Sequence, residues 1–138
     1  MVSIKPRAIQ LVPVDVGKAT AMALVADLFG EVVVEPFGFD LTEAGVSVLV
    51  AAVSSAESER EAVMVRFGVE AAGRYHRTLM ASLRRQGLEV VELNPGAVAE
   101  ARSGQGKRRL KSDVRDLAAM ADLLARGGGR PPQRVDTE

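Results

Sequence analysis

Two aspartates in the last helical segment are the first candidates for chemistry. Asp113 and Asp116 lie three residues apart at the start of a helical pattern that runs from Ser112 to Arg126 and ends at the glycines 127–129. The apolar stripe of this segment consists of Leu110, Leu117, Met120 and Leu124. At roughly 100° per residue, Asp113 falls in the middle of that stripe, where an uncompensated carboxylate is costly. The alternative is that both acids only stabilise the helix N-terminus, with Ser112 as N-cap.

Two further acids end predicted strands. Asp15 closes the apolar run 8–16, and Glu70 follows the apolar run 62–69. Ligands of open α/β sheets gather at the carboxyl ends of strands near the point where the strand order reverses. If the two strands are neighbours, Asp15, Glu70, Asp113 and Asp116 meet at one edge of the sheet.

The elements that would position these acids alternate along the chain. The pattern predicts strands at 8–16, 20–27, 31–37, 62–69 and 88–93 and helices at 40–53, 74–86, 97–101 and 112–126. Three strands in a meander followed by alternating helices and strands are typical of an α/β fold. Right-handed crossovers then place the first strand beside the fourth. We therefore predict a five-stranded mixed sheet of order 3-2-1-4-5, flanked by helices.

Details of two helices follow from the same patterns. Asp40 is predicted to cap the first helix, with Glu43 at the capping-box position. The face of that helix expected to be buried carries Leu41, Ala44, Val48, Leu49 and Ala52. In the helix 74–86 the expected inner residues are Tyr75, Leu79 and Leu83, whereas His76 is expected on the exposed side.

Clustered carboxylates suit hard divalent cations. Mg²⁺ takes oxygen ligands, usually a few carboxylates together with waters and substrate phosphates. Two such ions about 4 Å apart can activate a water and stabilise the leaving oxygen in phosphodiester cleavage. A Mg²⁺ or Mn²⁺ site formed by the four acids is therefore one hypothesis for this chain.

A basic segment precedes the last helix. Its cations are Arg102, Lys107, Arg108, Arg109 and Lys111, and no acid interrupts them. Such a run can hold a phosphate backbone. The alternative is a solvated surface loop.

Composition narrows the classes of protein. The 138 residues are 47% hydrophobic, carry 18 basic and 18 acidic side chains and include no cysteine, which excludes disulfides, thiolate metal sites and cysteine nucleophiles. Met1 to Gln10 lacks the apolar core of a signal peptide, and no apolar run is long enough to span a membrane. A bacterial-type cytoplasmic protein is the expectation.

Four ordered blocks carry a family resemblance. They are Val14-Asp15-Val16-Gly17-Lys18, Glu70-Ala71-Ala72-Gly73-Arg74-Tyr75-His76, Leu93-Asn94-Pro95 and Lys111-Ser112-Asp113-Val114-Arg115-Asp116. In this order and spacing they resemble the DEDD transposases of bacterial insertion sequences, relatives of the Piv invertase. The chain has Ala72, Ser112 and Leu117 where members often have Thr, Thr and Ala.

The resemblance implies a fold and a reaction. It predicts a RuvC-like, RNase H-type N-terminal domain at 1–126. Independently of the resemblance, the composition of residues 127–138, rich in Gly, Pro and Arg, predicts a disordered tail. The resemblance implies that Asp15, Glu70, Asp113 and Asp116 form an acidic tetrad that binds Mg²⁺ for DNA cleavage and joining. Family members continue into a second domain with a serine nucleophile, and no serine of this chain matches that motif. We therefore expect the acidic centre to be incomplete on its own.

Other interpretations remain open. The domain could be a non-catalytic nucleic-acid-binding or dimerisation module, or a self-sufficient RuvC-like junction nuclease. The resemblance also leaves open a guide RNA as a second partner and a homo-oligomer in a full transposase. Gly17-Lys18 lacks the rest of a phosphate loop, since Val12 and Ala19 replace the required Gly and Ser/Thr. Ordinary surface charges are expected at Glu92, Glu100 and Asp122.

Overall fold

Strands precede and then alternate with helices along the chain. The structure is a computed structural model that describes residues 8–71, 73–104 and 112–127, with side chains omitted at 104 and 112–115. Its elements are β1 (Ile9–Val16), β2 (Thr20–Asp27), β3 (Val32–Asp40), α1 (Glu43–Arg60), β4 (Met64–Glu70), α2 (Tyr75–Arg85), β5 (Glu89–Leu93), α3 (Pro95–Gly104) and α4 (Ser112–Ala125).

The strands form one mixed sheet of order β3-β2-β1-β4-β5, which confirms the predicted order. β1 is antiparallel to β2 and parallel to β4, and β5 adds in parallel to β4. The central strand β1 contains Pro13, which is buried. The pairs between β1 and β2 are interrupted at Val12 and Pro13, where proline has no N–H to donate.

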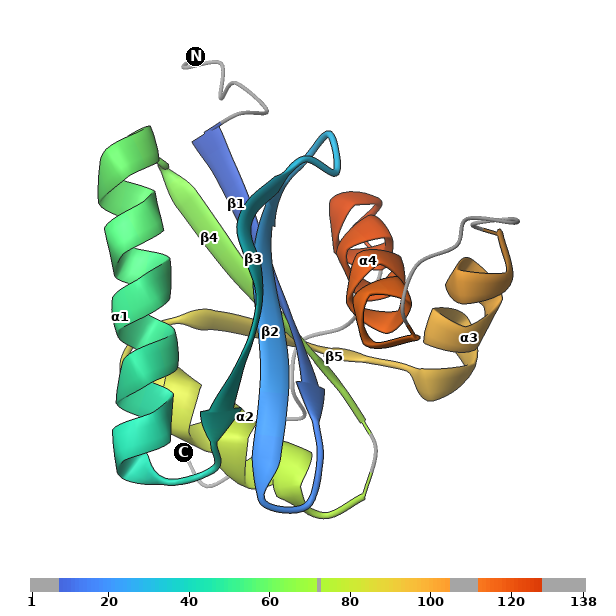
Figure 1. Ribbon diagram of the computed structural model, residues 1–138, viewed down its shortest axis with the longest axis horizontal. Helices are drawn as coiled ribbons and strands as arrows, with labels where there is room; N and C mark the ends of the chain where they lie inside the picture. The colour runs from blue at the N-terminus through green and yellow to red at the C-terminus, as the bar shows by residue number, and fades with distance from the viewer. Residues whose placement is uncertain (1–7, 72, 105–111, 128–138) are drawn as a thin grey trace, which may run out of the picture.

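Helices cover both faces of the sheet (Figure 1). α1 and α2 pack on one face, and α4 packs on the other face with α3 beside it. Side chains alternate between the two faces along each strand. In β1, Val12 and Val14 belong to the core under α1 and α2, whereas Leu11 belongs to the core under α4. The parity of a strand residue therefore decides which helical layer it meets.

A glycine lets α4 come close to β4. A Cβ atom added at Gly68 would lie 2.7 Å from both Leu124 methyl carbons, well inside contact distance. Leu124 is itself buried among Leu11, Leu117 and Met120, so it has no room to withdraw. The seat of α4 on the sheet therefore depends on the missing side chain at position 68.

The first helix begins later than the sequence predicts. Asp40 is still part of β3, where it pairs with Thr20 of β2, so the prediction that Asp40 caps the helix is wrong. The N-cap is Thr42, whose Oγ1 accepts a hydrogen bond of 3.0 Å from the Gly45 amide. The helix also continues through the polar stretch to Arg60.

The predicted buried faces of α1 and α2 are also partly wrong. Apolar residues surround α1 on most sides, so spacing alone does not choose its buried face. Val48 is exposed, and the buried residues are Gly45, Val46, Leu49, Val53 and Ala56. In α2, His76 is buried and Tyr75 is 49% exposed, the reverse of the prediction. The inner stripe passes through His76, Leu79, Met80 and Leu83.

Two further predictions concern a membrane span and the C-terminal tail. None of the helices among the described residues is both long and apolar enough to span a bilayer. Apart from Gly127, the predicted tail at 127–138 lies outside the described residues.

Candidate active site

Asp15 and Glu70 lie on the same face of the sheet, at the ends of neighbouring parallel strands. Asp15 shares the parity of Leu11, and Glu70 shares the parity of Gly68, so both side chains belong to the face that α4 covers. The register pairs Val14 with Val69, which puts Asp15 and Glu70 at the same level one residue further on. Adjacent strands are about 4.8 Å apart, so these two acids are close neighbours. Both are half-buried.

The backbone around Glu70 is fixed by β5. Glu70 pairs with Leu93, and the Ala71 amide donates a 2.9 Å hydrogen bond to the Leu93 carbonyl. β4 thus stays attached to the sheet up to the acid and leaves it only afterwards, toward α2.

α4 contributes the third described acid. The buried side chains Leu117, Met120 and Leu124 orient this helix toward the sheet, and Asp116 stands beside Leu117 with its side chain 26% exposed. Asp113 belongs to the first turn of α4, but its side chain is not among those described. The prediction that Asp113 joins the other acids is therefore not tested.

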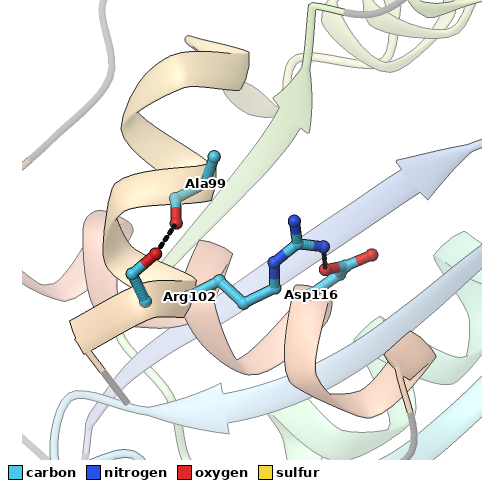
Figure 2. Close-up of polar contacts among 4 residues, drawn as sticks. Ala99, Arg102 and Asp116 are labelled. Atoms are coloured by element: carbon cyan, nitrogen blue, oxygen red, sulfur yellow. Dashed lines mark hydrogen bonds and ion pairs between the residues drawn. The ribbon is translucent and has the colours of Figure 1, made fainter. Parts of the chain in front are cut away.

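α3 brings a cation to Asp116. Asn94 caps α3, since its Oδ1 accepts hydrogen bonds from the Gly96 and Ala97 amides at 2.8 and 3.2 Å. Arg102 lies two turns further along and reaches across to α4, as Figure 2 shows. Its Nη1 donates a 2.7 Å hydrogen bond to Asp116 Oδ1, an ion pair with Arg102 45% exposed.

The charges of these side chains act on one another. Burial raises the pKa of the Glu70 carboxyl, the negative charges of Asp15 and Asp116 raise it further, and Arg102 lowers it. Glu70 is thus the point at which three carboxylates from β1, β4 and α4 repel one another. Arg102 partly offsets that repulsion.

The three carboxylates suit a bound cation, but on their own they do not form a complete set of metal ligands. A divalent ion would relieve the repulsion around Glu70, and half-buried carboxylate oxygens are the ligands that Mg²⁺ prefers. Among side chains that the structure describes, no three His, Asp or Glu lie close enough together to hold a metal ion. A complete site would need Asp113 or a movement of the acids toward one another.

Of the predicted basic segment, only Arg102 lies among the described cations. Arg102 lies on α3 and pairs with Asp116, whereas Lys107, Arg108, Arg109 and Lys111 lie outside the described residues. The sequence predicts Arg102 as a phosphate ligand and gives no signal for its pairing with Asp116, because the two residues are 14 positions apart on different helices.

Another pair was not predicted. The buried His76 of α2 lies with Nε2 3.4 Å from Oε2 of Glu92 in β5, so Glu92 is not the ordinary surface charge that was expected. This pair belongs to the face opposite the three acids, since Val90, which shares the parity of Glu92, packs under α1 and α2.

Comparison with solved structures identifies the class of fold. RuvC of T. thermophilus, solved in complex with a Holliday junction substrate, matches with a TM-score of 0.56 at 12% identity, over 90% of this chain and 99% of that chain. The Ppx/GppA family member of Aquifex aeolicus matches with a TM-score of 0.42 at 12% identity over 69% of this chain. EutJ of Carboxydothermus hydrogenoformans matches with a TM-score of 0.38 at 20% identity over 67% of this chain. This chain spans 39% of the length of each of the latter two. The fold is RuvC-like, of the RNase H type.

Comparison with family models then identifies the family. The model for DEDD transposases of the IS110 group, described as a transposase, matches residues 12–138. The chain therefore belongs to this DEDD transposase family, which confirms the resemblance inferred from the sequence. Comparison with curated proteins gives no match.

Proposed function

We propose that this chain provides the acidic centre of a DNA transposase, which cuts and joins DNA strands with the help of Mg²⁺ or Mn²⁺. The observation that carries the proposal is the half-buried Glu70 between the charges of Asp15 and Asp116, at the carboxyl ends of β1 and β4. Membership of the transposase family supports the choice of reaction. A stable fold gains nothing from this repulsion, so a bound cation is the reason we infer for it.

Each acid has a proposed role. Asp15, Glu70, Asp113 and Asp116 would hold the metal, which when bound would polarise the phosphodiester and stabilise the leaving oxygen. Asp15 and Glu70 are anchored by the sheet, so they would keep a fixed spacing. Asp113 and Asp116 move with α4, so its seat on Gly68 would set their distance from the sheet.

DNA is the proposed partner, and the phosphate backbone its point of contact. The basic segment with Arg102, Lys107, Arg108, Arg109 and Lys111 is the proposed phosphate-binding segment, and its described member, Arg102, contacts Asp116. Arg102 would exchange Asp116 for a phosphate when DNA and metal enter. A guide RNA, a homo-oligomeric assembly, the domain boundary at residue 126 and a cytoplasmic place of action remain predictions from the family resemblance and the sequence.

A domain exchange tests this function. Residues 1–126 would replace the equivalent domain of an active transposase of the same family, and recombination of a donor plasmid would be measured. We expect the exchanged protein to recombine DNA, Asp15→Asn to abolish recombination, and Glu59→Gln, an exposed acid on α1, to leave it intact. Equal recombination by the Asp15→Asn variant would contradict the proposal.

A second assay separates the alternatives. The chain alone would be incubated with a labelled four-way junction and a linear duplex in Mg²⁺. Cutting of the junction that requires Asp15 would favour a self-sufficient junction nuclease over a transposase domain. Binding of the junction or the duplex by a parent protein that neither cuts nor recombines DNA would favour a non-catalytic module.

A further inference from the structure

A stripe of arginines covers the outer side of α2. Arg74 precedes the helix as its N-cap residue, and the stripe continues through Arg77, Arg84 and Arg85. At 100° per residue these four positions fall within an arc of about 100°. All four are exposed, and the buried residues of α2 lie on the other side of the helix. We call these four residues the α2 arginine stripe.

No acid balances the stripe among the described side chains. Between Glu70 and Glu89 the chain has no Asp or Glu, and Glu89 already binds Arg66 at 2.9 Å. The ion pairs found in the described residues include none of the four arginines. By contrast, α1 carries Glu57 and Glu59 close to its Arg60. Within the described residues, no ion pair therefore uses the positive charge of the α2 arginine stripe.

The helix dipole accounts for only two of the four arginines. Arg84 and Arg85 lie in the last turn, where cations interact favourably with the helix dipole. Arg74 and Arg77 lie at the N-terminal end, where the same dipole disfavours cations, and the first turn contains no acid. The placement of Arg74 and Arg77 lowers the stability of the helix, which indicates that they bind a partner outside the molecule.

The position of the stripe indicates what that partner is. α2 begins five residues after Glu70, so its N-terminal end lies near the edge of the sheet where the acids are, and the helix lies on the face of the sheet opposite α4 (Figure 1). From Arg74 to Arg85 the rise is about 16 Å at 1.5 Å per residue. One strand of duplex DNA passes about five phosphates over that distance, at 3.4 Å each.

We propose that the α2 arginine stripe is a second binding surface for duplex DNA, separate from the acids and from the basic segment before α4. It binds the phosphate backbone of DNA that extends past the acidic edge onto the face of the molecule covered by α2. The choice of DNA rests on the proposed function. The stripe gives affinity and orientation without sequence readout, because arginine contacts to phosphates are the same for every sequence.

Salt-dependent binding tests the stripe. The chain would be titrated into a fluorescent duplex in EDTA, so that the metal site contributes nothing. We expect Arg74→Gln/Arg77→Gln to lower the slope of log K against log salt by about 0.9 for each phosphate that the variant no longer neutralises, which amounts to up to roughly eightfold in affinity per phosphate at 0.1 M salt. Arg84→Gln/Arg85→Gln should have the same effect, and Arg74→Lys/Arg77→Lys should keep the slope.

The matched control removes the same charge elsewhere. Arg60→Gln/Arg126→Gln changes the net charge by the same amount at the ends of α1 and α4, and it should leave the slope as in the parent. Melting temperatures of all variants would verify that they fold. The inference is overturned if the stripe variants keep the parent slope, or if they lose binding to single-stranded RNA or anionic vesicles but not to duplex DNA. Failure of the proposed function would show instead in the Asp15→Asn domain exchange.

Discussion

Replacing Gly68 by alanine should dislodge α4 from the sheet. The new Cβ would lie 2.7 Å from Cδ1 and Cδ2 of Leu124 and 2.9 Å from its Cγ. Ordinary carbon contacts are 3.5–4.0 Å, so α4 or β4 must shift by about 1 Å. Leu124 is only 1% exposed and cannot turn away. The shift would carry Asp116 away from Glu70.

The size of the effect follows from two opposed contributions. Overpacking a buried site costs about 1–3 kcal/mol, whereas Gly→Ala restricts the unfolded chain and returns about 0.4–1 kcal/mol. We expect Gly68→Ala to destabilise the protein by about 1–2 kcal/mol. For a chain of 138 residues that lowers the melting temperature by roughly 3–7 °C.

A double-mutant cycle identifies the cause. Leu124→Ala alone should cost about 2–5 kcal/mol, because it leaves a cavity. In Gly68→Ala/Leu124→Ala the new methyl group enters that cavity, so the double variant should be about 1 kcal/mol or more better than the sum of the single changes. Gly38→Ala in the edge strand β3 is the control, since the nearest atom to its Cβ is Met22 Sδ at 3.4 Å. It should be close to neutral. Additive costs, or a neutral Gly68→Ala, would refute the close packing of α4 on β4.

Three further outcomes are expected. Without metal, Glu70→Gln should raise the melting temperature at neutral pH. The pKa of Glu70 is raised in the folded protein, so ionisation of this carboxyl makes the folded state less stable as the pH rises above 4.5, the ordinary pKa of a glutamate. The gain in melting temperature should vanish below that pH, and a gain that is the same at every pH would refute this reasoning. Arg102→Gln removes a partly exposed ion pair, so it should lower the free energy of unfolding in urea by less than about 1 kcal/mol, and by less still in high salt. A larger loss that does not depend on salt would show that Arg102 has another structural role. Replacing three of the five cations of the basic segment together, Lys107, Arg108 and Arg109, should lower the salt slope of DNA binding by about 0.9 for each phosphate no longer neutralised. An unchanged slope would show that the segment is only a solvated loop.

The sheet was predictable because its signals are local and periodic. The largely apolar runs 8–16 and 20–27 were recognisable as strands. The rule for right-handed crossovers then leaves one order for the five strands. Asp15 and Glu70 followed directly, since each ends a predicted strand. Their common face follows from strand parity once the register is known.

The helices were less predictable, because their apolar residues do not select a single face. Gly45 and Val46 are buried in α1 although Val48 fits the spacing equally well. His76 is buried instead of Tyr75, because α2 begins at Tyr75 and its inner stripe starts one residue later. The pairing of Arg102 with Asp116 depends on how α3 packs against α4, which no local pattern encodes. The α2 arginine stripe, by contrast, is visible in the spacing of residues 74, 77, 84 and 85.

The most direct test of the acidic centre is a thermal melt with increasing Mg²⁺ or Mn²⁺. A metal that binds only the folded protein adds about 2.7 kcal/mol of stability at a concentration 100 times its Kd. We predict that the melting temperature of the parent rises with metal concentration, that Asp15→Asn, Asp113→Asn and Asp116→Asn each remove most of the rise, and that Glu59→Gln retains it. A parent that ignores both metals, or aspartate variants that respond as the parent does, would contradict a metal site formed by these acids.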